Sequence, residues 1–301
     1  MAAVQQKQHW KLIGLLNWTA DYLAQKGFEN SRLEAERLLA HSLHIQRIDL
    51  YVNFERPLIP DELAQFKSLL KRRLAHEPLQ YIIGETEFYS LPFKVAPGVL
   101  IPRPETEILV ENALQIIDKN LPQDKVINIL DVGTGSGNIA IAIAKNAAHA
   151  RLTAIDISAA ALKIARENAE LNNVADKINF LQHDALGDWP SHFTNYFDLI
   201  LSNPPYVSEA EFENLPREIR EFEPRNALLG GKDGVDFYNN FCQIVKNLLR
   251  ADGVVLFEIG ETMGSFLEKS FQRCGFISSE IIKDLTKKDR ILKIVKGGEN
   301  E

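Results

Sequence analysis

Apolar residues near the start of the chain recur at the three- and four-residue spacing of an amphipathic helix. Trp10, Ile13, Leu16 and Leu23 would share one face of such a helix. Helical spacing of this kind continues to about residue 80. We therefore expect residues 1–80 to form a small helical domain, because helices with one apolar face bury that face against one another.

Two helix starts inside this domain are marked by the sequence. Ser31 and Glu34 have the spacing of a capping box, and Pro60 fits the first turn of another helix. The second of these helices carries the basic run Lys71–Arg73. We expect this run to form a solvated helix face, and a docking patch for a partner protein is the alternative.

The pattern changes after residue 80. Residues 81–102 mix β-branched and aromatic residues with turn-forming prolines and glycines, which predicts a β-rich linker. Helical and strand patterns then alternate through a second domain, residues 103–301. This alternation favours an α/β fold with a parallel sheet and helices on both faces. Strands are expected at 126–132, 151–156, 178–183, 197–202 and 253–259, with two more within 275–296.

The composition is that of an ordinary globular protein. Hydrophobic residues make up 45% and charged residues 25% of the 301 residues. Acidic residues outnumber basic ones by 41 to 34, and the net charge of −7 argues against strong non-specific nucleic-acid binding. Apolar runs are too short to cross a bilayer, so we expect a cytoplasmic protein without membrane association. Cys242 and Cys274 are expected to be reduced thiols.

A glycine-rich loop joins the first expected strand of the sheet to the helix that follows it. Its residues are Gly133, Thr134, Gly135, Ser136 and Gly137. Glycines let the backbone approach a ligand closely, and the start of a helix leaves N–H groups free to bind it. A nucleotide-type ligand is therefore expected. Asn138 breaks the dinucleotide-binding pattern, and no Walker lysine is present.

Acidic residues close three successive predicted strands: Asp131, Asp156 and Asp184. Asp131 would oppose a pyrophosphate but suits a cation. S-adenosylmethionine carries an ammonium and a sulfonium group and no phosphate, so it fits this loop. Asp156 lies 19 residues after Gly137, the offset expected for a carboxylate that binds ribose hydroxyls. Asp184 could reach the adenine edge. Ordinary helix caps and turn residues are the structural alternative.

A stiff turn, Asn203, Pro204, Pro205 and Tyr206, directly follows the strand at 197–202. The prolines have no N–H group, so the turn offers carbonyl acceptors, and the Asn203 side chain adds another. Such a turn suits a ligand NH₂ group. Tyr206 could cover this planar group and favour its developing positive charge. We expect the turn beside the glycine loop, and a rigid surface turn is the alternative.

The loop and the turn together favour methyl transfer to an amide nitrogen. An amide nitrogen is a poor nucleophile because its lone pair is delocalised. Two acceptors that hold its hydrogens orient the lone pair toward the methyl group of the sulfonium, and the proton leaves afterwards. Positioning and electrostatics would then supply most of the effect.

Longer stretches of the chain resemble the release-factor glutamine methyltransferase family (PrmC/HemK). They are PLQYIIGETEFYSLPFKVAPGVLIPRPETEILVE at 78–111, LDVGTGSGNIAIAIA, SNPPYV, and EPRNALLGGKDGVDFY at 223–238. With the helical domain, the resemblance covers nearly the whole chain. It implies a seven-stranded Rossmann-like S-adenosylmethionine-dependent methyltransferase domain. It also implies N5-methylation of the glutamine in the Gly-Gly-Gln motif of class I peptide chain release factors.

The resemblance also implies roles for individual residues. Residues 133–137, Asp156 and Ala185 would line the cofactor site, and Asn203 to Tyr206 would hold the glutamine, with Asn203 near the cofactor as well. Relatives often carry an aromatic residue in place of Ala185, so stacking on adenine would be lost unless Trp189 supplies it. The helical domain is expected to recognise the release factor.

Some alternatives stay open. Pro104–Thr106 would begin a helix, and we expect this segment also to cover the cofactor. The Asn-Pro-Pro-Tyr sequence alone is shared with methyltransferases of adenine amines, so an adenine-amine methyltransferase acting on DNA or RNA is one alternative. An inactive cofactor-binding scaffold is another. His41 and His44 fit a helix-surface pair better than a metal site, and no metal is expected. We expect a monomer without stable nucleic-acid binding.

Overall fold

The computed structural model describes residues 10–120 and 125–297, and the chain divides into two compact units. The first is Met1–Gly84 and the second is Glu85–Glu301. The boundary lies inside the segment that was expected to be a linker. The helical domain thus extends slightly beyond residue 80, and the second domain begins well before residue 103.

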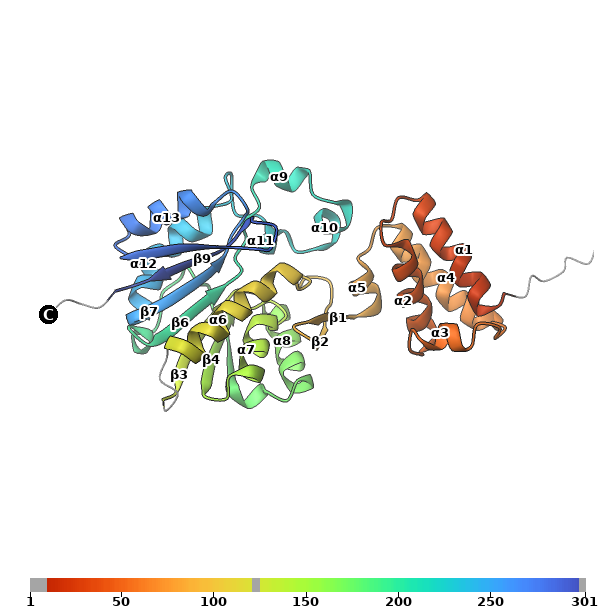
Figure 1. Cartoon of the computed structure of the whole chain (residues 1–301), viewed down its shortest axis with the longest axis horizontal. Helices are drawn as coiled ribbons and strands as arrows, with labels where there is room; N and C mark the ends of the chain where they lie inside the picture. Colours follow the sequence, from red (N-terminus) through yellow and green to blue (C-terminus); the bar gives the residue numbers. More distant parts are fainter. Residues whose placement is uncertain (1–9, 121–124, 298–301) are drawn as a thin grey trace, which may run out of the picture. The chain divides into compact units, whose positions relative to one another are not determined.

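The first unit is a set of helices around one apolar core, as the hydrophobic spacing predicts. α1 packs on α2, and α2 packs on α4 (Figure 1). Leu16 and Leu23 of α1 and Leu38 and Leu39 of α2 are fully buried in this core. The helices are α1 (Leu12–Gln25), α2 (Ser31–Leu43), α3 (Asp49–Val52), α4 (Pro60–Leu74) and α5 (Leu79–Ile83).

Both predicted helix starts in this unit are confirmed, but the capping box predicted at Ser31 is wrong. α4 begins at Pro60. α2 begins at Ser31 itself, with Asn30 before it and no side-chain capping bond. Glu34 closes no capping box, because its carboxylate binds the guanidinium of Arg73 through two hydrogen bonds of 2.7 and 2.9 Å.

The basic run Lys71–Arg73 does not form a uniformly solvated face. Arg73 is only 4% exposed, and its guanidinium lies 4.4 Å from the ring centre of Phe28 while it holds its ion pair to α2. Arg72 pairs with Glu77 at 2.5 Å. Two of the three cations are therefore neutralised within their own unit, and one of these pairs is largely buried.

The second unit is built on a seven-stranded sheet, which confirms the expected α/β fold. The strand order is β5-β4-β3-β6-β7-β9-β8, and neighbouring strands are parallel except where β9 pairs with β7 and β8. β7 begins at Leu249 rather than at residue 253. The strands are β3 (Ile127–Val132), β4 (Ala150–Asp156), β5 (Ile178–Gln182), β6 (Phe197–Ser202), β7 (Leu249–Glu258), β8 (Ser278–Lys283) and β9 (Asp289–Val295).

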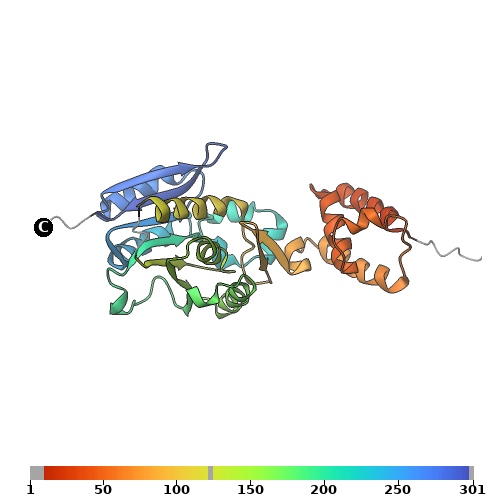
Figure 2. The same cartoon turned by 60° about the horizontal axis from the view of Figure 1, so that its bottom comes forward.

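Helices cover both faces of the sheet (Figures 1 and 2). α6 (Glu107–Asn120), α7 (Asn138–Asn146) and α8 (Ala159–Leu171) share one core with it, and α12 (Asp236–Leu248) and α13 (Gly264–Arg273) share the other. Along β3, Ile129 belongs to the first core and Leu130 to the second, as the alternation of a strand requires.

Short helices add to this framework. A helix start at η1 was expected from the sequence, whereas α13 and the other short helices were not. Within the two described ranges, no helix is long and apolar enough to span a bilayer. The short helices are η1 (Pro104–Thr106), η2 (Ala175–Lys177), η3 (Ser191–Phe193), α9 (Glu209–Glu213), α10 (Arg217–Phe222) and α11 (Arg225–Leu228).

The segment 81–102 is not a separate linker. Its first three residues end α5, and an antiparallel hairpin follows, formed by β1 (Glu85–Phe88) and β2 (Leu91–Lys94). Phe88 and Phe93 are buried in the core that contains α6 and α7. The Asn168 side chain of α8 accepts a hydrogen bond from the Lys94 N–H (2.7 Å) and donates one to the Lys94 carbonyl (3.0 Å). These contacts make the hairpin part of the second unit.

The expectation of two reduced cysteines is wrong. Cys242 of α12 and Cys274, just after α13, form a disulfide with their Cα atoms 6.5 Å apart. α12 and α13 pack next to each other in one core. This packing, which residue spacing alone does not reveal, brings the two positions within the reach of a disulfide.

Candidate active site

A cavity opens at the carboxyl ends of β3, β4, β5 and β6, where open α/β sheets bind their ligands. The predicted residues Asp131, Gly137 and Tyr206 lie outside its wall. The structure thus brings most of the glycine loop, two acids and most of the proline turn to one cavity. The predicted residues in the wall are Gly133, Thr134, Gly135, Ser136, Asp156, Asp184, Ala185, Asn203, Pro204 and Pro205.

The glycine loop has a backbone that requires glycine. Gly133, Gly135 and Gly137 have φ angles of 71°, 56° and 83°, in the left-handed region. A Cβ at Gly133 or Gly135 would meet no protein atom closer than 3.9 Å, so these positions leave room for a ligand against the backbone. A Cβ at Gly137 would lie 2.9 Å from Ile141 and 3.1 Å from Ala165. Gly137 therefore serves the packing of α7 against α8.

Asp131 lies behind the loop and is fully buried. Its Oδ2 accepts hydrogen bonds from the Thr134 hydroxyl (2.6 Å) and from the Ala140 N–H (3.2 Å). Its Oδ1 has no hydrogen-bond partner in the described part of the chain. Burial raises the pKa of this carboxyl to about 7, although the two hydrogen bonds lower it. Asp131 thus holds the loop to α7. Because Asp131 does not line the cavity, the structure does not support its predicted contact with a ligand cation.

Asp156 lies in the wall at the end of β4 and also supports the loop. Its Oδ2 accepts from the Gly135 N–H (2.9 Å), and its Oδ1 accepts from the Ser158 N–H (2.8 Å). Each oxygen keeps a further lone pair, so the carboxylate can still accept from ligand hydroxyls. Asp184 is exposed at the rim after β5, where it accepts a hydrogen bond from the Leu186 N–H (2.9 Å).

The proline turn starts directly after β6, beside β3, as predicted. The two strands are parallel neighbours, with Ser202 opposite Val132. Residues 203–205 lie in the cavity wall. Asn203 donates from Nδ2 to the hydroxyl of Thr106 (3.1 Å). Because the amide nitrogen is tied to the protein, the amide oxygen is the group available to a ligand.

Tyr206 is directed into the protein. Its hydroxyl donates to Oε1 of Glu258 (3.2 Å), at the end of β7, and its ring packs on the core that contains α12. Burial raises the pKa of Tyr206 well above its usual value, and the nearby Glu258 carboxylate raises it further. Tyr206 anchors the turn. Because Tyr206 does not line the cavity, the structure does not support the prediction that its ring covers the ligand NH₂ group.

Two segments distant in sequence, residues 98–106 and 223–237, close another side of the cavity. They are joined by the buried carboxylate of Glu223, which accepts hydrogen bonds from the Ile101 N–H (3.3 Å) and the Arg103 guanidinium (2.5 Å). This arrangement supports a covering role for the segment before α6, besides its role as a helix start. The wall residues from these segments are Gly98, Val99, Leu100, Pro102, Arg103, Thr106, Pro224, Asn226, Ala227 and Phe237.

Neither residue considered for stacking on adenine, Ala185 or Trp189, places an aromatic ring in the cavity wall after β5. Ala185 lines the cavity with His183 and Leu186, whereas Trp189 does not. The Trp189 indole N–H donates to the Ala185 carbonyl (3.0 Å), and its ring meets the His183 ring edge-on at 4.5 Å. Trp189 is thus held behind the wall. The ring that reaches the wall is His183, whose Nε2 is buried without a partner among the described residues.

Three residues at the site were given no role there by the sequence patterns: Glu223 ties two wall segments, Glu258 holds the proline turn, and His183 lines the cavity. The bond from Asn203 to Thr106 was not predicted either. A signal existed for Glu258, an acid that ends a strongly apolar strand. The other contacts join segments far apart in the sequence, which no local pattern reveals.

The residues present fit S-adenosylmethionine. The loop glycines leave space beside the backbone, and two carboxylates lie in the wall for hydroxyl or cationic groups. The only lysine or arginine among the wall residues is Arg103, and Glu223 already neutralises it. A ligand with phosphates would lack a free cation in this wall, whereas a sulfonium needs none.

Comparisons with known proteins agree with this description. The chain matches two family models, the PrmC N-terminal domain at residues 14–84 and the methyltransferase small domain at residues 107–220. The release factor glutamine methyltransferase of Geobacter sulfurreducens is 40% identical over 291 residues, which cover 96% of this chain and 98% of that protein. The corresponding protein of Rhodopirellula baltica is 39% identical over 297 residues, 98% and 100% of the two chains.

A solved structure supports the fold alone. A methyltransferase from Pyrococcus furiosus aligns with a TM-score of 0.51 at 18% identity, over 78% of this chain and 98% of that one. The family follows from the sequence matches, which extend across both units and nearly the full length of each relative. The chain belongs to the release factor glutamine methyltransferase family.

Proposed function

We propose that this protein transfers a methyl group from S-adenosylmethionine to the side-chain nitrogen of the glutamine in the Gly-Gly-Gln motif of class I peptide chain release factors. Beside the family, one observation carries the proposal. The acceptor-rich turn after β6 and the glycine loop after β3 line the same cavity, because their strands are neighbours. A methyl donor at the loop and an amide at the turn would therefore meet.

The glycine loop and Asp156 would hold the methyl donor. S-adenosylmethionine supplies a methyl group made electrophilic by a positively charged sulfur. The backbone at Gly133 and Gly135 would pack along it, and Asp156 would accept from the ribose hydroxyls. Asp184 and Ala185 would line the adenine side. These contacts fix the donor without a lysine or an arginine near the sulfonium.

The proline turn would orient the glutamine amide. Its two N–H groups would donate to the Asn203 side-chain oxygen and to the Pro204 carbonyl, which leaves the nitrogen lone pair directed at the methyl carbon. As the N–C bond forms, the electron pair of the breaking C–S bond stays on sulfur. One amide hydrogen then leaves to water as a proton. The protein needs to position the amide and needs no strong base.

The decisive experiment offers labelled S-adenosylmethionine to purified release factor and to duplex DNA and maps the label by mass spectrometry. We expect label on the Gly-Gly-Gln glutamine and none on DNA. Label on an adenine amine would identify an adenine-amine methyltransferase instead. Binding of S-adenosylmethionine without transfer to either substrate would identify a cofactor-binding scaffold.

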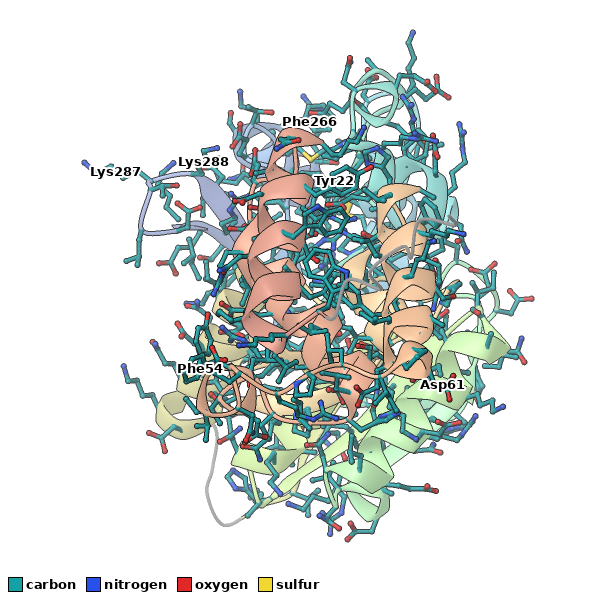
Figure 3. The ribbon with its side chains drawn as sticks, turned by 90° about the vertical axis from the view of Figure 1, so that its right-hand side faces the viewer. Tyr22, Phe54, Asp61, Phe266, Lys287 and Lys288 are labelled. Atoms are coloured by element: carbon teal, nitrogen blue, oxygen red, sulfur yellow. A yellow bond between two sulfur atoms is a disulfide. The ribbon has the colours of Figure 1, made fainter. Side chains whose placement is uncertain are left out.

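We further propose that the first unit recognises the release factor. One glutamine side chain offers little contact, whereas specific protein interfaces bury about 1,200–2,000 Å². Exposed apolar side chains gather in one short segment of this unit, at Ile48, Val52 and Phe54, which are 60%, 69% and 48% exposed. Figure 3 shows Phe54 on the outside of the unit. This segment is a better docking candidate than the basic run of α4.

A double substitution, Val52→Asp with Phe54→Asp, tests this docking role. We expect the KM for full-length release factor to rise at least about tenfold, a typical effect of losing interface anchors. Methylation of a short Gly-Gly-Gln peptide should not change. The control is Leu285→Asp, a still more exposed apolar residue just before Lys287 and Lys288 of the β8–β9 turn (Figure 3). Equal losses on both substrates would contradict the docking role.

The proposed function also bears on the cellular location and the oligomeric state of the enzyme. Release factors act in translation, so we place the enzyme in the cytoplasm. Every wall residue of the cavity comes from the second unit of one chain, and we propose that a monomer is active. Stable nucleic-acid binding is not part of the proposal.

A further inference from the structure

The wall segment 223–237 packs directly on the Asn-Pro-Pro-Tyr turn. The N–H of Val207, the residue after the turn, donates to the Leu228 carbonyl, and the Gly230 N–H donates to the Val207 carbonyl, both at 2.9 Å. A Cβ at Gly230 would lie 2.5 Å from the Pro205 carbonyl oxygen, so this close approach requires glycine. The segment therefore forms the part of the wall that adjoins the proposed acceptor site.

Asn226 is the one polar side chain that this segment contributes to the described cavity wall. It belongs to α11, two residues before Leu228, whose carbonyl binds the residue after the turn. Asn226 is exposed, and its amide has no hydrogen-bond partner in the described part of the chain. A side-chain amide offers both N–H donors and an acceptor oxygen, so both kinds of group are free for a ligand here.

The other polar side chains of the described wall are already engaged, except that of His183. The ring of His183 packs edge-on against Trp189, and its Nε2 is buried away from solvent. Asn226 thus differs from its neighbours in having an accessible and unused amide. The wall side chains with a hydrogen bond or an ion pair to the protein are Arg103, Thr106, Thr134, Ser136, Asn138, Asp156, Ser158, Asp184, Ser202 and Asn203.

A glycine beside the acceptor glutamine would present only main-chain groups to this wall. The glutamine side chain is short, so its main chain must stay close to the cavity when its amide is held at the turn. Glycine has no side chain, and an enzyme can recognise it only through its N–H, its carbonyl and its missing Cβ. In an extended chain, the N–H and the carbonyl of one residue can both bind the same partner. A side-chain amide carries the complementary donor and acceptor.

We propose that Asn226 is a specificity-determining residue that binds the main chain of the glycine next to the acceptor glutamine. Its amide oxygen accepts from the glycine N–H, and its amide nitrogen donates to the glycine carbonyl. The inference deepens the proposed function and rests on it, because that function places the glutamine at the turn. The two asparagines then have different roles: Asn203 orients the reacting amide, and Asn226 holds the chain that carries it.

Asn226→Ala tests this role without removing a contact inside the protein. For a short Gly-Gly-Gln peptide, we expect KM to rise about tenfold, because a pair of neutral hydrogen bonds is lost. The kcat and the affinity for S-adenosylmethionine should not change. The matched control is Asn240→Ala, an exposed asparagine of α12 outside the cavity wall, which should leave all three quantities unchanged.

A modified peptide identifies the group that Asn226 binds. Sarcosine in place of the glycine next to the glutamine replaces its N–H by N–CH₃. We expect sarcosine to raise the KM of the wild type about tenfold. The rise should be at least about threefold smaller for Asn226→Ala, because the bond is already absent in that variant. Equal rises in the two enzymes would overturn the main-chain contact.

Methylation by the wild type distinguishes the failure of this inference from failure of the proposed function. If the wild type transfers no label to the Gly-Gly-Gln glutamine, both fail together. If the wild type methylates this glutamine and Asn226→Ala has the same KM for the peptide, the inference alone is overturned. A loss in Asn226→Ala that is confined to kcat or to S-adenosylmethionine affinity has the same meaning.

Discussion

Asp131 and Glu258 are two buried acids with similar surroundings and different partners. Each is buried near the carboxyl end of a strand, each has its pKa raised to about 7 by burial, and each has one oxygen without a hydrogen-bond partner among the described residues. Asp131 binds Thr134 and Ala140, both close to it in the chain. Glu258 binds Tyr206, which follows a different strand.

The comparison teaches that burial sets the pH at which a carboxyl titrates, whereas its partners set what the titration changes. Asp131 supports the loop proposed to hold the methyl donor, so its charge should affect donor binding. Glu258 supports the turn proposed to hold the acceptor, so its charge should affect the transfer step. The two loops also differ: the glycine loop offers space beside its backbone, and the proline turn offers acceptors on a stiff backbone.

The largest effect should come from breaking the turn alone. Asn203→Ala removes the side-chain acceptor, and loss of one oriented hydrogen bond of this kind costs about 10² to 10³ in rate. The affinity for S-adenosylmethionine should change far less, because the glycine loop and Asp156 remain. Single-turnover kinetics and calorimetry on the same variant measure the two quantities. Wild-type turnover would contradict the proposed role of the turn.

Breaking the loop side should produce the opposite pattern. Asp156→Ala removes the bonds to Gly135 and Ser158 and the proposed bonds to ribose. A charge-assisted bond contributes about 1.5 to 3 kcal/mol, so the affinity for S-adenosylmethionine should fall at least about tenfold. The kcat at saturation should fall less. Asp184→Ala, at the exposed rim, is the matched control with a smaller expected loss. Unchanged affinity in Asp156→Ala, measured by calorimetry, would show that the acid does not hold the donor.

The titration of Asp131 can be isolated by its effect on the pH dependence of the free energy of unfolding. The pKa of Asp131 rises from 3.8 in the unfolded chain to about 7 in the folded protein. The folded state then binds more protons, so this group's stabilising contribution is complete below about pH 4 and is lost as the pH rises to about 7. Asp131→Asn should reduce the fall in the free energy of unfolding over this range by about 4 kcal/mol. Urea unfolding at several pH values measures it, and parallel wild-type and variant curves would refute it.

A smaller effect should distinguish a ligand-facing glycine from an ordinary one. Gly135 and Gly27 both have positive φ angles, 56° and 87°, with room for a Cβ. Replacing either by alanine should cost about 1 kcal/mol of stability because of backbone strain. Only Gly135→Ala should also weaken S-adenosylmethionine binding, by a few-fold, because only Gly135 lines the cavity. Equal affinity in the two variants would argue against a ligand at the loop.

Features governed by local pattern could be predicted from the sequence. The helical unit, the seven strands and the glycine loop follow from apolar spacing and turn chemistry within a few residues. The neighbouring positions of the loop and the turn also followed, because an α/β sheet with this alternation restricts which strands pair. Confirmation of the β3–β6 pairing justified placing Asn203 beside the loop.

Features that depend on the direction of a side chain could not be predicted. Asp131 and Tyr206 were expected to contact ligand, but each turns inward to a hydrogen-bond partner. The capping box at Ser31 failed because Arg73, distant in the chain, competes for the same carboxylate. The link from Thr106 to Asn203 joins residues 97 positions apart. Such contacts exist only once the sheet has assembled.

The buried side chain of Asn168 has a consequence for protein synthesis. It bonds to both backbone groups of Lys94 and to the Ser136 carbonyl, so it ties the hairpin to the glycine loop. Lys94 leaves the ribosome 74 residues before Asn168, an interval on the order of ten seconds at ordinary elongation rates. During this interval, the hairpin carries the apolar rings of Phe88 and Phe93 without its final support. The hairpin therefore gains the hydrogen bonds of Asn168 only after α8 has left the ribosomal tunnel.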